Sequence, residues 1–287
     1  MRSIAFTGVP QNHEMNELSV RSWIQEQATQ GRLFFTREEI LKALPGTSKL
    51  TVTIGLLRAG ETRLISIAWQ EFYLIPPAYA KQRTLPVAMY LDALMKYLKH
   101  PYCVALLNAA AFYGAAHQLS QTFAVMMTIP LPRPKTQHGT RLEFAGKREF
   151  SQGIPPELLK EFKTPSGYIQ VSSPEVTALT LVQYAGRIGG LSRVLTVLEE
   201  LLEACHFDHM PNSILSCVPL PCFQRLGYMI EVLLGDEEKS KSQYTFLKTY
   251  HRPLQKSLWS LESPVKTGVV NKRWKLIINE TLESDLS

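Results

Sequence analysis

Residue types that bind zinc occur together in the second half of the chain. Cys205, His206 and His209 lie close in sequence, and Cys217 and Cys222 follow them. Thiolates and imidazoles are the usual zinc ligands. However, the spacing matches no common zinc module and contains no paired C-x-x-C motif. We therefore expect Cys205 to belong to a hydrophobic core, and we predict no metal site.

Groups that could catalyse a reaction are also scattered. A magnesium-dependent nuclease needs clustered carboxylates, whereas Glu143, Glu149 and Glu175 form no cluster in the sequence. There is no G-x-S-x-G nucleophile elbow. The glycines that follow Arg187 lack the preceding strand that a phosphate-binding loop requires. We predict a protein without catalytic residues or cofactors, and therefore not an enzyme.

The segment from Thr47 to Thr53 has a different chemical character, because it combines hydroxyls with a lysine. Lysine can bind guanine or a phosphate, and hydroxyls can donate to or accept from base edges. No acidic residue occurs between Glu39 and Glu61, so a helix here would not repel DNA. With flanking arginines and one glutamine, the predicted DNA-contacting residues are Ser48, Lys49, Thr51, Thr53, Arg58, Arg63 and Gln70.

The elements expected around this segment are three short helices and a hairpin. Ser19 can cap a first helix, and Thr36 with Glu39 forms a capping-box pattern for a second, which Pro45-Gly46 stops. Thr47 or Ser48 caps a third helix that ends near Gly60. The β-rich runs 63–69 and 72–75 then predict a hairpin. This order is typical of a winged helix, whose third helix reads the major groove.

The remainder of the chain predicts a larger mixed domain. Helical patterns are expected at 86–99, 101–116, 174–184, 191–204 and 221–234, and extended runs at 122–129, 141–150, 168–172 and 274–278. The predicted fold class is α+β: an N-terminal winged helix-turn-helix domain followed by a larger mixed α+β C-terminal domain. The predicted boundaries are a mobile segment 1–18, a DNA-binding domain 19–80 and a C-terminal domain 86–287.

Several of these stretches, taken in order, resemble the AbiEi antitoxin family of bacterial type IV toxin–antitoxin systems. They are Phe72–Tyr79, Tyr90–Tyr97, Pro101–Gln118, Thr164–Leu179, Gly189–Leu195, Gln224–Tyr228 and Arg273–Asn279. The resemblance implies a sequence-specific repressor of its own operon, which binds an inverted repeat in the promoter. It also implies antagonism of a nucleotidyltransferase-like toxin without a required direct complex. Both a stable homodimer on DNA and cooperative binding by monomers are compatible with the sequence.

The tip of the predicted hairpin departs from the family pattern. The wing of the family usually carries arginines and a glycine at its tip, whereas this chain has Trp69-Gln70-Glu71-Phe72 there. Glu71 would repel a phosphate, so either the tip turns away from DNA or Trp69 and Gln70 make a different contact.

Charge is divided unevenly along the chain. Residues 1–85 carry ten basic and seven acidic residues (+3), residues 86–238 carry twelve and fourteen (−2), and residues 239–287 carry nine and four (+5), which gives the total of +6. The basic C-terminal part could make a second DNA contact through Lys266, Lys272, Arg273 and Lys275. An equally good explanation is a strand edge protected by lysines.

Two other classes of function remain open. In one, the winged helix is a scaffold for protein interaction, and the chain neutralises a partner by direct contact. In the other, the body is a degenerate nuclease targeted by a DNA-binding head. The sequence has no signal-peptide pattern and no apolar run that could cross a bilayer, and its cysteines are too sparse for a disulfide scaffold. We therefore expect a cytoplasmic location and no membrane partner.

Overall fold

The computed structural model describes residues 11–77, 85–116, 122–133, 135–137, 140–147 and 153–281. The chain forms two compact units. The first contains residues 1–97 and the turn 164–167, and the second contains residues 98–163 and 168–287. The division falls after Tyr97, so the segment 86–97 groups with the first unit rather than with the C-terminal domain to which the sequence assigned it.

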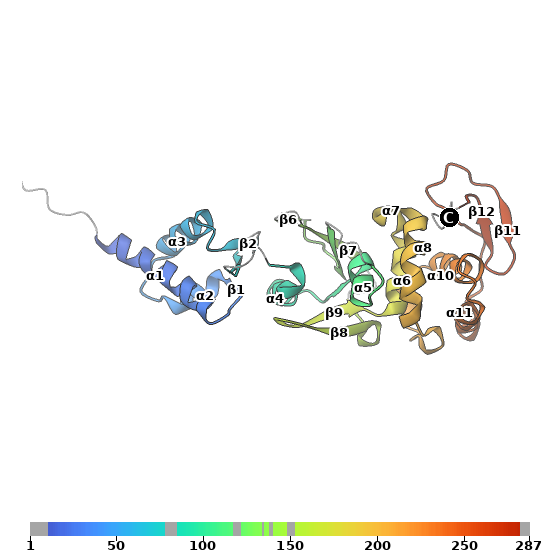
Figure 1. Cartoon of the computed structure of the whole chain (residues 1–287), viewed down its shortest axis with the longest axis horizontal. Helices are drawn as coiled ribbons and strands as arrows, with labels where there is room; N and C mark the ends of the chain where they lie inside the picture. Colours follow the sequence, from blue (N-terminus) through green and yellow to red (C-terminus); the bar gives the residue numbers. More distant parts are fainter. Residues whose placement is uncertain are drawn as a thin grey trace, which may run out of the picture. The chain divides into compact units, whose positions relative to one another are not determined.

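Three helices and a small sheet make up most of the first unit (Figure 1). The helices are α1 (Gln11–Thr29), α2 (Arg37–Ala43) and α3 (Lys49–Glu61). The strands β1 (Phe34–Thr36), β2 (Ser66–Trp69) and β3 (Phe72–Leu74) form an antiparallel sheet in the order β1-β3-β2. A 3₁₀ turn, Val87–Met89, and α4 (Leu91–Leu98) follow. The element order is thus α1-β1-α2-α3-β2-β3.

Local sequence explains where α2 and α3 begin. The Thr36 hydroxyl accepts from the Glu39 N–H, and the Glu39 carboxylate accepts from the Thr36 N–H, which completes the predicted capping box. Burial by itself raises the pKa of Glu39, but the hydrogen bonds from Thr36 and Arg32 outweigh burial and lower that pKa. Ser48 caps α3 by accepting from the Thr51 N–H. Of the two predicted caps for this helix, Ser48 is therefore the one used.

The predicted start of the first helix is wrong. Ser19 lies inside α1, which begins at Gln11. The predicted mobile segment 1–18 therefore includes helical residues from Gln11 onward, while residues 1–10 lie outside the described part. Residues 11–18 are mostly polar and do not show the spacing of apolar residues that marks a buried helix face. The sequence pattern therefore did not predict this part of the helix.

The core of the first unit joins all three helices to the sheet. Its buried members are Val20, Ile24, Phe35, Ile40, Val52, Leu56, Ala59, Ile65 and Ile75. Helices α1 and α3 pack closely enough that a Cβ built on Gly55 would lie 2.8 Å from Val20 Cγ1. Gly55 is thus required by the helix contact, although glycine weakens a helix interior.

A six-stranded mixed sheet begins the second unit. Its order is β6-β7-β5-β4-β9-β8, with β4 (Tyr102–Val104), β5 (Thr122–Thr128), β6 (Lys135–Gln137), β7 (Thr140–Lys147), β8 (Leu159–Thr164) and β9 (Gly167–Ser172). β4 pairs antiparallel with β5 and parallel with β9, and β5 pairs parallel with β7. A 3₁₀ turn, Pro156–Leu158, precedes β8.

The single helix predicted for 101–116 is wrong. Residues 102–104 form β4, and only α5 (Leu106–Phe112) is helical. All three β4 residues are buried, so the strand shows no alternation of apolar and polar residues. A short apolar run of this kind cannot be distinguished from a buried helix by its pattern alone.

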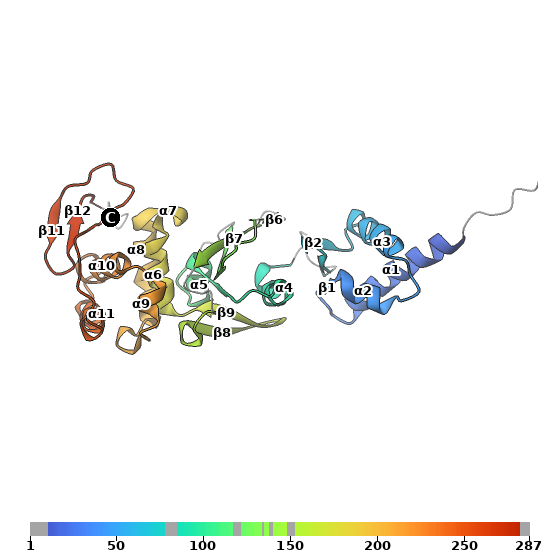
Figure 2. The same ribbon diagram turned by 180° about the vertical axis from the view of Figure 1, so that it is seen from behind.

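Further helices form the rest of the core, and they can be followed in both views (Figures 1 and 2). They are α6 (Pro174–Gln183), α7 (Ala185–Ile188), α8 (Gly190–Leu201), α9 (Ile214–Cys217), α10 (Leu220–Tyr228) and α11 (Glu237–Thr249). Two 3₁₀ turns, Leu202–Ala204 and Phe207–His209, follow α8. α6 packs against α5, α8 and α10, and nine of its ten residues are buried. It is therefore the central helix of this unit.

The chain after α10 completes the second unit. A π-helical turn, Met229–Leu233, continues α10. The strands β10 (Ser257–Leu258), β11 (Val269–Asn271) and β12 (Leu276–Ile278) form a small sheet in the order β10-β12-β11. The buried Trp274 packs on α10, where a Cβ on Gly227 would lie 2.2 Å from Trp274 Cη2. The basic stretch that starts at residue 239 lies partly in the helix α11, for which no helix was predicted from the sequence.

Candidate nucleic-acid interface

The predicted DNA-contacting residues lie on or beside α3. Lys49 and Thr53 are exposed on the N-terminal half of this helix, and Ser48 is exposed at its cap. Gln70 is exposed in the turn between β2 and β3. Arg58 and Arg63 are exposed at the C-terminal end of α3 and just after it. The first unit therefore presents hydroxyls and cations along one helix.

Thr51 does not fit this surface, and its assignment needs correction. Its side chain is only 2% exposed, and its hydroxyl lies 2.8 Å from that of Ser48. Thr51 thus points into the unit on the same side as Val52 and Leu56, which are also buried. It supports the helix cap and is not available to a base edge.

The tip of the hairpin is tied to α3 through a residue that the sequence analysis missed. Arg37, the first residue of α2, donates from Nη1 to Glu71 Oε1 at 2.9 Å and from Nη2 to Thr53 Oγ1 at 2.6 Å. Its backbone N–H also donates to the Glu71 carbonyl at 2.9 Å. We call Arg37, Thr53 and Glu71 the Arg37 bridge.

The Arg37 bridge changes what Glu71 contributes to the surface. Arg37 pairs with the carboxylate that was expected to repel phosphate, so the local charge of the hairpin tip is balanced. Thr53 Oγ1 also donates to the Lys49 carbonyl at 2.8 Å. The sequence indicated that Arg37 needs a partner. Arg37 directly follows the N-cap Thr36 of α2, where a positive charge is unfavourable for the helix dipole.

Apolar side chains also lie on the exposed face of α3. Leu50 and Leu57 are each 64% exposed, and they are seven residues apart, which places them on the same side of the helix. Val52 and Leu56 occupy the buried side. The apolar residues of α3 therefore divide between two sides of the helix. Val52 and Leu56 face the core, whereas Leu50 and Leu57 face outward.

The predicted C-terminal contact set is only partly available. Arg273 donates to Glu231 Oε1 at 2.9 Å, and its guanidinium lies over the rings of Tyr244 and Trp274. Lys266 Nζ donates to the carbonyls of Leu261 and Ser263. Arg273 and Lys266 therefore serve the fold of the second unit. Lys272 and Lys275 are exposed at the turn between β11 and β12.

The thiols of Cys205, Cys217 and Cys222 lie in the core of the second unit. In the part of the chain that the structure describes, no three histidine, cysteine or acidic residues are grouped so as to hold a metal ion. All four cysteines of the sequence are described, and each is a buried free thiol. Cys205 Sγ donates to the Leu201 carbonyl, and burial raises the pKa of this thiol. Within the described ranges, no helix is long and apolar enough to cross a membrane.

Comparison with known proteins identifies the class of the second unit. Residues 102–232 match the family model described as AbiEi antitoxin C-terminal domain. This segment of the chain is therefore similar to the AbiEi antitoxin family, and the resemblance found in the sequence is confirmed. An antitoxin of this kind implies a toxin as its functional counterpart. No curated protein matches the chain.

The fold as a whole is shared with a solved structure. The crystal structure of the RV2827C protein from Mycobacterium tuberculosis is similar to this chain with a TM-score of 0.60. The two sequences are 13% identical, and the similarity covers 91% of this chain and 90% of the other. At this identity the likeness concerns the fold alone.

Proposed function

We propose that the chain is a sequence-specific DNA-binding antitoxin that represses its own toxin–antitoxin operon and counteracts a nucleotidyltransferase-like toxin. In this proposal the first unit is a winged helix, α3 is its recognition helix and the β2–β3 hairpin is its wing. The observation that carries the proposal is the exposed N-terminal half of α3, which offers Lys49 and Thr53 and contains no acidic residue. The antitoxin part rests on the family of residues 102–232.

The placement of side chains supports a definite set of contacts. A recognition helix reads base edges from its N-terminal residues. We assign this role to Lys49 and Thr53, with Ser48 at the cap and Gln70 from the hairpin. Arg58 and Arg63 would contact the flanking phosphates, and Lys272 and Lys275 would provide any second contact. Arg37 would hold Thr53 and the wing in register through the Arg37 bridge.

The test compares the DNA upstream of the gene with a shuffled duplex of the same composition. We expect affinity in the nanomolar range for the upstream DNA, and a steep loss of affinity as salt rises. Lys49→Ala and Thr53→Ala should reduce the ratio of specific to shuffled binding, whereas Arg63→Ala should weaken both alike. Equal affinity of the wild-type chain for the two duplexes would contradict sequence-specific repression.

Thr51→Ala is the matched control for Thr53→Ala. Both changes remove a threonine hydroxyl from α3, but the Thr51 side chain is buried and the Thr53 side chain is exposed. We therefore expect Thr51→Ala to lower stability while leaving the specificity ratio unchanged. A loss of specificity in both variants would show that the contact surface has been assigned to the wrong side of the helix.

A second candidate function has one observation in its favour. Leu50 and Leu57 on α3 and Ile67 on β2 are exposed apolar side chains, which suit a protein interface as well as a DNA groove. If the first unit is instead a protein-interaction module, the chain should co-purify with its toxin in a stoichiometric complex. In that case Leu57→Ser would disrupt the complex, and upstream DNA would not shift in a gel.

A further inference from the structure

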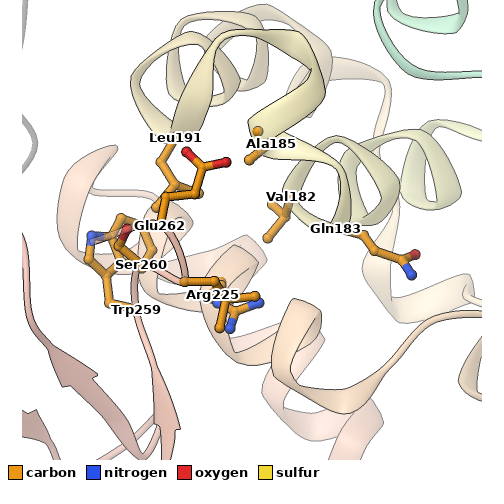
Figure 3. A pocket seen from close by; sticks show the side chains of 10 residues that line it. Val182, Gln183, Ala185, Leu191, Arg225, Trp259, Ser260 and Glu262 are labelled. Atoms are coloured by element: carbon orange, nitrogen blue, oxygen red, sulfur yellow. The ribbon is translucent and has the colours of Figure 1, made fainter. Parts of the chain in front are cut away.

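A small cavity in the second unit contains a buried arginine whose charge has no ion-pair partner among the residues that the structure describes. The cavity lies between α6, α7, α8 and α10 on one side and the chain after β10 on the other, and its volume is about 90 Å³. Its lining includes Val182, Leu191, Arg225, Trp259 and Ser260 (Figure 3). It is separate from α3 and the β2–β3 hairpin, since the described lining residues all belong to the second unit.

Arg225 is only 6% exposed. Its Nε donates to the Leu258 carbonyl at 3.0 Å, and this is its single hydrogen bond to the described residues. No carboxylate in those residues lies within ion-pair distance of its guanidinium. Neither Nη group has a hydrogen-bond partner among the described residues, and Arg225 lines the cavity, from which solvent reaches these groups. An unpaired buried charge is costly, so this arrangement favours an anion as the missing partner.

Among the described residues of the cavity lining, Glu262 is the one with an acidic side chain, and its carboxylate faces elsewhere. Its Oε1 lies against α7, where a Cβ built on Gly186 would be 1.8 Å away. In Figure 3 its carboxylate points towards Ala185, away from the guanidinium of Arg225. Glu262 thus leaves Arg225 unpaired, although its negative charge opposes a bound anion at that end of the cavity.

The rest of the lining indicates what kind of anion would fit. The lining combines polar groups with an apolar wall, which is formed by Val182, Ala185, Leu191 and the ring of Trp259. Ser260 adds a hydroxyl, which accepts from the Ser263 N–H and retains its own hydrogen for donation. The volume of about 90 Å³ has room for on the order of six water molecules, which is too small for a nucleotide.

We propose that the cavity binds a short aliphatic carboxylate, whose carboxylate group pairs with the two Nη groups of Arg225 and whose carbon chain lies against Val182, Leu191 and Trp259. A guanidinium presents two parallel N–H donors that match the two oxygens of a carboxylate. This site is independent of the proposed DNA-binding function, and it adds a small-molecule ligand to the antitoxin domain.

The test uses the full chain with butyrate as the probe. Butyramide is the neutral analogue of the same size, and inorganic phosphate is an anion without a carbon chain. Calorimetry and the indole N–H resonance of Trp259 report binding. We expect butyrate to bind and to shift this resonance, and we expect butyramide and phosphate to bind at least about tenfold more weakly. Absence of butyrate binding, or equal binding of either analogue, overturns the proposal.

Arg225→Gln is the decisive variant, because the amide nitrogen of glutamine occupies the position of the arginine Nε. It can keep the hydrogen bond to Leu258 while removing both Nη groups. We expect this variant to weaken butyrate binding by roughly tenfold to a hundredfold. Arg252→Gln removes an exposed arginine of the same unit and should leave butyrate binding unchanged. Unaltered binding in Arg225→Gln overturns the assignment.

Thermal unfolding separates a ligand-binding arginine from a purely structural one. Without carboxylate, Arg225→Gln should unfold at a higher temperature than the wild type, because the unpaired buried charge is gone. Added butyrate should raise the midpoint of the wild type and not that of the variant. If Arg225→Gln instead unfolds at a lower temperature both with and without butyrate, Arg225 is structural and the proposal fails.

Discussion

At the scale of single residues, Leu50 and Leu57 are the apolar side chains that α3 would bring to the major groove under the proposed function, beside Lys49 and Thr53. Each has 64% of its surface exposed, and neither is needed for the core of the first unit. In the major groove, thymine is the base that carries a methyl group, and apolar side chains recognise it by contact. The proposed recognition helix should therefore favour thymines opposite these two leucines.

Replacing thymine by deoxyuridine tests this preference, because the change removes only the methyl group. On a duplex selected by the chain from a random library, each replacement at a contacted position should weaken binding about threefold to fourfold. In Leu50→Ala or Leu57→Ala the same replacement should have no further effect at the matching position. Failure to select any duplex argues against DNA recognition itself, whereas a selected duplex that is insensitive to deoxyuridine refutes only the role of the leucines.

At the scale of elements, the contact between α1 and α3 depends on Gly55. Alanine at this position would gain about 1 kcal/mol of helix propensity. It would also force its Cβ against Val20, where overpacking costs typically about 1–3 kcal/mol. We expect Gly55→Ala to lower the free energy of unfolding of the first unit, as measured by urea denaturation.

Gly60→Ala provides the control in the same helix. A Cβ at Gly60 has no atom within 4 Å, so only the propensity gain remains. This variant should be more stable than the wild type by about 0.5–1 kcal/mol. If both alanine variants are stabilised, α1 can move away from α3 without cost, and the close packing does not limit the stability of this unit.

The elements of the first unit could largely be predicted from local chemistry. Thr36 with Glu39 and Ser48 mark the starts of α2 and α3, because their hydroxyls satisfy free backbone N–H groups of the helix itself. The strand β4 could not be predicted, because its pairing with β5 and β9 involves residues distant in sequence. The same limitation applies to the site. The exposure of Lys49 and Thr53 on α3 could be predicted from their positions in a helix, whereas the Arg37 bridge depends on three separate elements meeting in space.

At the scale of the whole molecule, each unit has its own buried core. The core that contains Val20 and Phe35 belongs to the first unit, and the core that contains Leu179 and Phe223 belongs to the second. Gly227→Ala should disturb only the second core, because its Cβ would collide with Trp274. We expect calorimetry to show two transitions, of which this variant lowers one by roughly 5–10 °C. A single transition that moves as a whole would show that the two units unfold cooperatively.

The π-helical turn at Met229–Leu233 has a consequence for how this fold can change during evolution. A π turn is an α-helix with one inserted residue. Here the π turn contains Glu231, whose carboxylate accepts hydrogen bonds from Arg273 and from the indole N–H of Trp274. Deleting one residue from this turn would rotate the remaining side chains by about 100° and remove the acceptor from both partners. A homologue that has lost this residue should therefore also have replaced the arginine at the position of Arg273, so the two changes should be inherited together.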